Sequence, residues 1–138
     1  MGFFSAHFGR RQESSKGRFR SNDDYDKNRA GQMAGAPRVL GQLRQGGITD
    51  QDLRKLEYFF YTNSEEKATT LAGKLAQLGY AGKYDHSAGD KKNFVITGWT
   101  GPMRMDEPTI LNWTRLMCDL GRNDDCEFDG WGTYITPE

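Results

Sequence analysis

A chain of 138 residues with 36% apolar content can build one modest hydrophobic core and leaves little for a second. Lys+Arg and Asp+Glu number 19 each, so the overall charge neither indicates nor excludes nucleic acid as a partner. No apolar run approaches the roughly 20 residues that span a bilayer, and no signal-peptide core develops near Met1. We therefore expect a soluble, cytoplasmic protein.

The two cysteines, Cys118 and Cys126, fit that compartment. A domain of this size does not need a disulfide for stability, and cytoplasmic thiols stay reduced. We expect both to be buried structural thiols, with a disulfide as the alternative.

Residues 1–22 are predicted to form a disordered basic arm. They are rich in Arg, Ser, Gly and Phe and have no helical or alternating pattern to offset the entropy of ordering. Four arginines interleaved with phenylalanines could bind single-stranded RNA through phosphate contacts and stacking: Arg10, Arg11, Arg18 and Arg20. The alternative is a solvated tail without a partner.

Helix is predicted from Asp23 to Gln45, although Pro37 could instead begin a shorter helix that ends at the same point. Gly46 and Gly47 stop it. Thr49 and Asp52 then form an imperfect capping box, which predicts a short helical turn over Asp50–Lys55.

The next two elements have clear periodicities. Leu56–Thr62 is aromatic and β-favouring, with bulky rings on both faces, which predicts a central strand. Asn63 resembles a helix cap, and apolar residues follow at helical spacing until Gly79: Ala68, Leu71, Ala72, Leu75 and Leu78.

Two further strands, Tyr80–His86 and Asn93–Trp99, flank a turn and form a predicted hairpin. Asp106 is the expected N-cap of another helix, which tolerates Pro108 in its first turn and ends at Gly121. A closing strand begins at Cys126.

The resulting order, β-α-β-β-α-β after an N-terminal helix, predicts an α+β fold of the ferredoxin-like sandwich type. We assign residues 23–138 to one domain, with the ferredoxin-like core at about 56–136. The first and third strands should be central and the last strand an edge. Both helices should cover one sheet face. Phe59 and Tyr61, or the residues that alternate with them, should point to the other face, which would need the N-terminal helix or a partner to cover it.

The closing segment Glu127–Tyr134 combines large aromatic residues with glycines: Phe128, Gly130, Trp131, Gly132 and Tyr134. It resembles the closing motif of the regulator of ribonuclease activity B family. Weaker similarity extends back to about Ala34, through Leu43–Gly47, Leu56–Tyr61 and Lys74–Tyr80. We assign these motif residues a structural role and expect Trp131 in the core.

The resemblance implies a non-enzymatic protein that binds ribonuclease E, or a similar RNA-processing enzyme, and inhibits RNA cleavage. The residues themselves offer no catalytic constellation, because neither His7 nor His86 is placed as a general base. We expect no cofactor. An RNA-binding module that uses the arm and an open sheet face is the alternative function.

Four carboxylates are the candidate partner-binding residues, on an acidic strand edge that we expect to face water: Asp124, Asp125, Glu127 and Asp129. They could meet Arg-rich segments of a partner. Their spacing also resembles the opening of a calcium loop. Thr136 stands where such a loop needs a bidentate Glu, so we expect no metal.

Overall fold

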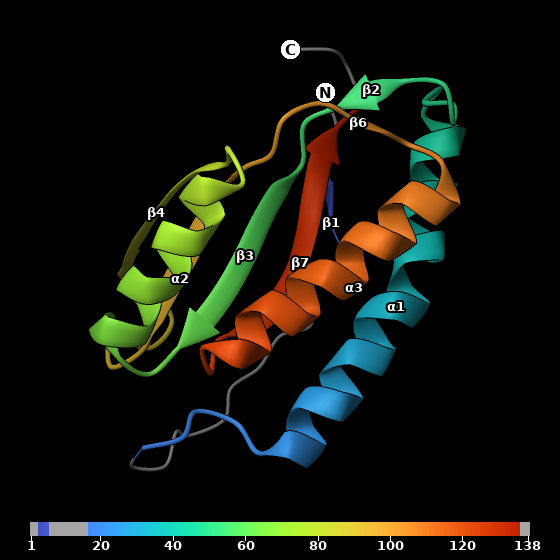
Figure 1. The fold of residues 1–138 in the computed structure, drawn as a ribbon. Helices are drawn as coiled ribbons and strands as arrows, with labels where there is room; N and C mark the ends of the chain where they lie inside the picture. Colours follow the sequence, from blue (N-terminus) through green and yellow to red (C-terminus); the bar gives the residue numbers. More distant parts are fainter. Residues whose placement is uncertain (1–2, 6–16, 136–138) are drawn as a thin grey trace.

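The computed structural model describes residues 3–5 and 17–135 (Figure 1). Its main sheet is antiparallel and has the strand order β1-β7-β3-β5-β4. The strands are β1 (Phe3–Ser5), β3 (Glu57–Thr62), β4 (Ala81–His86), β5 (Phe94–Trp99) and β7 (Glu127–Tyr134). A small second sheet pairs β2 (Leu53–Arg54) with β6 (Met103–Arg104).

Among the described residues there are three helices: α1 (Asn22–Gln45), α2 (Glu65–Gln77) and α3 (Glu107–Asn123). Figure 1 shows α2 and α3 crossing the sheet, with α1 alongside α3 on the β7 side. The predicted α+β class is confirmed. Because buried residues of α1 share one core with Tyr58 and Phe60, α1 joins the helical layer and does not cover the opposite sheet face.

Helix α1 is continuous through Pro37, so the shorter-helix alternative is wrong. Ser21 caps it by accepting a hydrogen bond from Asp24 N–H, and Pro37 lies on the exposed side. The opposite face of the same turns buries Ala36, Val39 and Leu40. Tertiary burial of this face compensates for the hydrogen bond that Pro37 cannot make.

The predicted helical turn over Asp50–Lys55 is also wrong. Thr49 and Asp52 do make reciprocal contacts, since Thr49 N–H donates to Asp52 Oδ2 and Asp52 N–H to Thr49 O. These bonds close a single turn. The chain then pairs as β2 with β6, so sheet bonds replace helical ones.

The other helix starts differ little from prediction. Asp106 is the N-cap of α3, as expected. In α2 the cap is Ser64 rather than Asn63, because Ser64 Oγ accepts the Lys67 N–H. Asn63 instead donates its side-chain amide to Gly17 O.

A bulge in β7 aligns its aromatic residues with the core. The register against β3 shifts between Phe59 and Phe60, so that Phe59 faces Gly130 and Phe60 faces Phe128. Gly130 has φ 127°, a conformation that favours glycine. Residues three apart point to opposite faces in a regular strand, and the extra residue turns both Phe128 and Trp131 inward.

The core forms where these rings meet α3. Phe60 packs on Phe128 with ring centroids 5.1 Å apart, and Trp113 makes edge contacts with Phe128 and Trp131. Trp131 is fully buried, which confirms its predicted core position. Cys118 and Cys126 are free and buried, as predicted, and burial raises the pKa of both thiols to about 12.

The sheet order corrects one expectation and confirms another. The strands β3 and β5 are central, as predicted. The closing strand β7 is not an edge, because β1 pairs with it: Phe3 faces Tyr134 and Ser5 faces Gly132. Phe3 and Phe4 are the only adjacent phenylalanines in the arm, but three residues are too few to show the alternation of a strand, so this long-range pairing has no periodic signal.

The predicted disordered arm is wrong for the parts of it that the structure describes. Besides β1, the segment Gly17–Ser21 packs on the domain, with Phe19 and Arg20 only 4% and 5% exposed. Residues 1–2 and 6–16 of the predicted arm lie outside the described residues. Within the described chain, none of the helices has the length and apolar content needed to cross a bilayer.

Candidate functional site

The loop between α3 and β7 meets three other parts of the chain. Asp125 lies in this loop with φ 56°, the left-handed conformation that Asp adopts more readily than most residues. Around it lie Phe19 and Arg20 from the N-terminal segment, Tyr25 from α1 and Lys67 from α2. We call these five residues the Asp125 junction.

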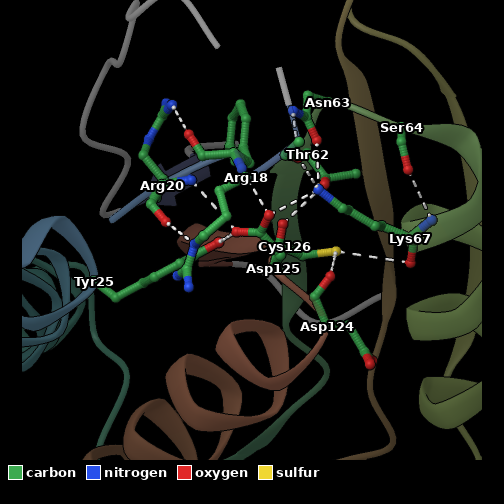
Figure 2. Close-up of polar contacts among 12 residues, drawn as sticks. Arg18, Arg20, Tyr25, Thr62, Asn63, Ser64, Lys67, Asp124, Asp125 and Cys126 are labelled. Carbon is green, nitrogen blue, oxygen red and sulfur yellow. Dashed lines mark hydrogen bonds and ion pairs between the residues drawn. The ribbon is translucent and has the colours of Figure 1, made fainter. Parts of the chain in front are cut away.

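Both carboxylate oxygens of Asp125 accept hydrogen bonds (Figure 2). Oδ2 accepts from Phe19 N–H at 2.6 Å and from Lys67 Nζ at 2.7 Å. Oδ1 accepts from Tyr25 Oη at 2.6 Å and from Arg20 N–H at 3.3 Å. The Lys67 ammonium also donates to Gly17 O and Asn63 Oδ1. One carboxylate thus joins two helices and two loops.

The charge on Asp125 is stabilised where it lies. Burial by itself raises the pKa of its carboxyl, but the hydrogen bonds from Lys67, Tyr25 and the Phe19 and Arg20 amides outweigh burial and lower it. Asp125 is therefore ionised at neutral pH. The Tyr25 hydroxyl shows the converse, since burial and its hydrogen bond to Asp125 raise its pKa.

A second, more deeply buried pair lies beside the junction. Arg20 Nε contacts Glu127 Oε1 at 3.3 Å, and both side chains are almost fully buried. The Arg20 guanidinium also donates to Phe19 O and lies 3.8 Å from the centre of the Phe19 ring. Breaking such a pair by removing one partner is costly, because the remaining charge stays buried.

A cleft of about 430 Å³ opens next to the junction, between the start of α2 and the end of α3. It is lined by residues of both charge signs: Arg18, Glu66, Lys67, Thr70, Arg122, Asn123, Asp124 and Asp125. Lys74 and Asp26 hold two of these by ion pairs, with Asp124 at 2.9 Å and Arg122 at 2.8 Å. Arg18, Glu66 and Asn123 are exposed.

The structure separates the four candidate carboxylates. Asp124 and Asp125 line the cleft. Glu127 and Asp129 are 1% and 6% exposed, so the expectation of a water-facing acidic edge is wrong for them. Glu127 points to Arg20, whose position the sequence pattern did not reveal.

The arginines predicted to contact RNA also differ in their exposure. Arg18 is exposed at the cleft, whereas Arg20 is buried against Glu127 and unavailable to RNA. Arg10 and Arg11 lie outside the described residues. The motif residues Phe128, Gly130, Trp131 and Gly132 are buried, and Tyr134 is half-buried and stacks on Trp99 with centroids 6.0 Å apart.

Sequence reasoning missed Phe19, Tyr25 and Lys67 as partners of the acidic loop. Each is separated from Asp125 by 58 residues or more, so no local spacing connects them. The one available signal was a carboxylate directly after a helix end, where an αL residue is common. Among residues 3–5 and 17–135, no group of three or more His, Cys, Asp or Glu residues could hold a metal.

A family model described as regulator of ribonuclease activity B matches residues 36–133, which is most of the chain. The chain belongs to this family. No curated protein matches the sequence. Proteins of the regulator of ribonuclease activity B family are regulators, not catalysts, and act through protein interaction.

The family match divides the Asp125 junction. Lys67 and Asp125 lie inside residues 36–133, as does the whole of β7 up to Thr133. Phe19, Arg20 and Tyr25 precede the matched region. In this chain, therefore, a segment outside the matched region is bound to the family domain through two of the domain's own carboxylates, those of Asp125 and Glu127.

Proposed function

We propose that residues 23–138 form a non-catalytic module that binds a ribonuclease, ribonuclease E or a similar RNA-processing enzyme, and modulates RNA cleavage in the cytoplasm. The observation that carries this proposal is the match of residues 36–133 to the regulator of ribonuclease activity B family. The resemblance of the closing motif to this family gives the direction of the effect, inhibition of cleavage. Two free, buried thiols support the compartment.

The cleft beside the Asp125 junction is the contact surface that we favour. Glu66 is exposed at its rim, and the carboxylates of Asp124 and Asp125 line it. An RNA-processing enzyme binds RNA through Lys- and Arg-rich segments. A basic segment that enters the cleft would meet these carboxylates and would no longer be available to RNA. Such attraction weakens as salt rises.

The first test is a pull-down with the full chain as bait, treated with nuclease to remove bridging RNA. The proposal expects a ribonuclease to be retained, and its cleavage of a labelled single-stranded RNA to slow as the chain is added. Retention should fall when salt is raised from 50 to 500 mM. If no ribonuclease is retained, or cleavage is unchanged at saturating chain, the proposal fails.

A charge reversal locates the contact. Glu66 and Glu107 are both exposed and both lie in the first turn of a helix, so reversing either removes the same favourable helix-dipole interaction. Only Glu66 lines the cleft. We expect Glu66→Lys to weaken ribonuclease binding about 3- to 10-fold and Glu107→Lys to leave it within about twofold. Equal effects would place the contact elsewhere.

Direct RNA binding by the basic N-terminal segment is the competing proposal. It is favoured by Arg18, which is exposed at the cleft, and opposed by the burial of Arg20. Binding of the full chain to single-stranded RNA, compared with a chain carrying Arg10→Ala, Arg11→Ala and Arg18→Ala, decides between the two. Salt-sensitive binding that the three substitutions abolish favours the RNA-binding module.

A further inference from the structure

The two edges of the main sheet are protected in different ways from pairing with another chain. At one edge lies β4, which pairs with β5 and has the exposed residues Lys83 and Asp85. Charged residues on an edge strand discourage pairing with another chain. At the other edge lies the short strand β1, which pairs with β7. The residues of β7 from Glu127 to Thr133 are all buried.

The cover that β1 provides is partial. It pairs with three residues, Gly132–Tyr134, of the eight in β7. Toward the start of β7, α1 supplies donors to the backbone instead: Asn28 Nδ2 and Gln32 Nε2 both reach Phe128 O, at 2.9 and 3.3 Å. Among the described residues, the added strand β1 therefore pairs with the part of β7 next to its C-terminal end.

The attachment of β1 is separate from that of the segment following it. Gly17–Ser21 is held by Asp125 and Glu127, through contacts that do not involve β1. The matched family domain begins at Ala36, so β1 also lies outside it. Losing the β1 pairing therefore leaves these contacts of Asp125 and Glu127 with the segment Gly17–Ser21 in place.

We propose that β7 is a strand-addition site and that β1 holds the place of an extended segment of the protein partner, which replaces it on binding. The identity of that partner rests on the proposed function. In strand addition, main-chain hydrogen bonds supply affinity and the side chains supply specificity. The sequence of β1 indicates the segment that fits: two adjacent bulky apolar residues and a small one, antiparallel to Gly132–Tyr134, as in Phe3-Phe4-Ser5.

The first experiment uses no ribonuclease. A full-length chain carrying Phe3→Pro and Phe4→Pro is compared with the unmodified chain, after circular dichroism shows that both fold. Successive N–H groups of a strand point to opposite sides, so two consecutive prolines remove a ladder donor whichever one faces β7. The probe is a fluorescently labelled peptide with the sequence of residues 1–9, and binding is followed by anisotropy.

We expect the peptide to bind the proline variant at least about tenfold more tightly than the unmodified chain, where tethered β1 competes at an effective concentration on the order of millimolar. Amide hydrogen exchange at Gly132–Tyr134 should speed up in the variant and slow again with peptide. A peptide carrying the same two prolines should not bind. Failure of the peptide to bind the variant, or equal binding to both chains, would overturn strand addition.

The second experiment tests the partner. Ribonuclease should bind the proline variant more tightly than the unmodified chain, and the peptide should compete with it. Equal ribonuclease affinities without competition would overturn the assignment of this edge to the partner. If ribonuclease binds neither chain, the proposed function fails, while the peptide measurement still decides whether β7 accepts a strand.

Discussion

The two halves of the segment Asp124–Trp131 stabilise the fold by different means. In the first half, the carboxylates of Asp124 and Asp125 in the α3–β7 loop bind donors that are distant in the sequence. These donors lie on the N-terminal segment, α1 and α2. In the second half, Phe128 and Trp131 pack against rings of β3 and α3. The polar half connects elements at their ends, and the apolar half fills the space between their faces.

The segment Asp124–Trp131 is therefore sensitive to two kinds of substitution. Shortening a side chain in the apolar half leaves a cavity, whose cost scales with the volume removed. Shortening one in the polar half leaves buried donors without an acceptor, whose cost scales with their number and charge. Substitutions in each half therefore test different physical terms.

The largest effect is expected from Trp131→Ala. Trp131 is fully buried between β7 and α3, so we expect a loss of about 3–5 kcal/mol in the free energy of unfolding, measured by urea denaturation. Among the described residues the indole N–H of Trp131 has no hydrogen-bond partner. Trp131→Phe should therefore cost less than Trp131→Ala, since it loses volume and no hydrogen bond. A variant that melts like the unmodified chain would remove Trp131 from the core.

Asp125→Ala is expected to cost about 2–4 kcal/mol, because Lys67, Tyr25 and two backbone N–H groups lose an acceptor together. The matched control is Asp119→Ala. Asp119 also carries an ion pair, at 3.6 Å from Arg29, but it is half exposed, and its loss should cost about 0.5 kcal/mol or less. Equal losses would mean that the junction contributes no more than a surface pair.

Local patterns were enough to predict the elements that lie next to each other along the chain. The sequence predicted the strand β3 and the helices α2 and α3 correctly. It also predicted the central positions of β3 and β5. In each, burial on one face repeats with the period of the element, as in the alternation of Tyr58 and Phe60 with Phe59 and Tyr61. The burial of Trp131 was predictable because a large aromatic ring flanked by glycines usually packs in a core.

The site was not predictable to the same degree. A carboxylate looks alike in sequence whether it meets water or a buried arginine, and Glu127 and Asp129 turned inward. Arg20 donates to Glu127, which lies 107 residues away in the sequence. The bulge that turns Phe128 and Trp131 to one face also shifts the register, so alternation along β7 could not assign its faces.

The third prediction is a pH dependence, which distinguishes the charge of Asp125 from its shape. The pKa of Asp125 is lowered in the folded chain, so its contribution to stability is present above the unfolded value, about 3.9, and is lost as pH falls through the folded value. Asp125→Asn keeps the shape without the charge. We expect it to be less stable by about 1–2 kcal/mol at pH 7.

That difference should shrink as the pH is lowered below about 4, because the unmodified chain then loses the same charge. The measurement is urea denaturation of both chains from pH 7 to pH 2.5. If the difference stayed constant over this range, the carboxylate charge would have no part in stabilising the junction.

The smallest effect is expected from Tyr25→Phe, which removes one of the four donors to Asp125 and keeps the buried ring. The Tyr25 Oη to Asp125 Oδ1 distance is 2.6 Å, and three donors remain when it is gone. We expect a cost of about 0.5–1.5 kcal/mol and a rise in the pKa of Asp125, read from a carboxyl NMR titration. Tyr84→Phe is the control, because Tyr84 Oη makes its hydrogen bonds to Thr69 and Glu65 at the surface. A cost for Tyr25→Phe as large as that of Asp125→Ala would mean that Tyr25 alone holds α1 to the loop, and that the N-terminal segment adds nothing to the junction.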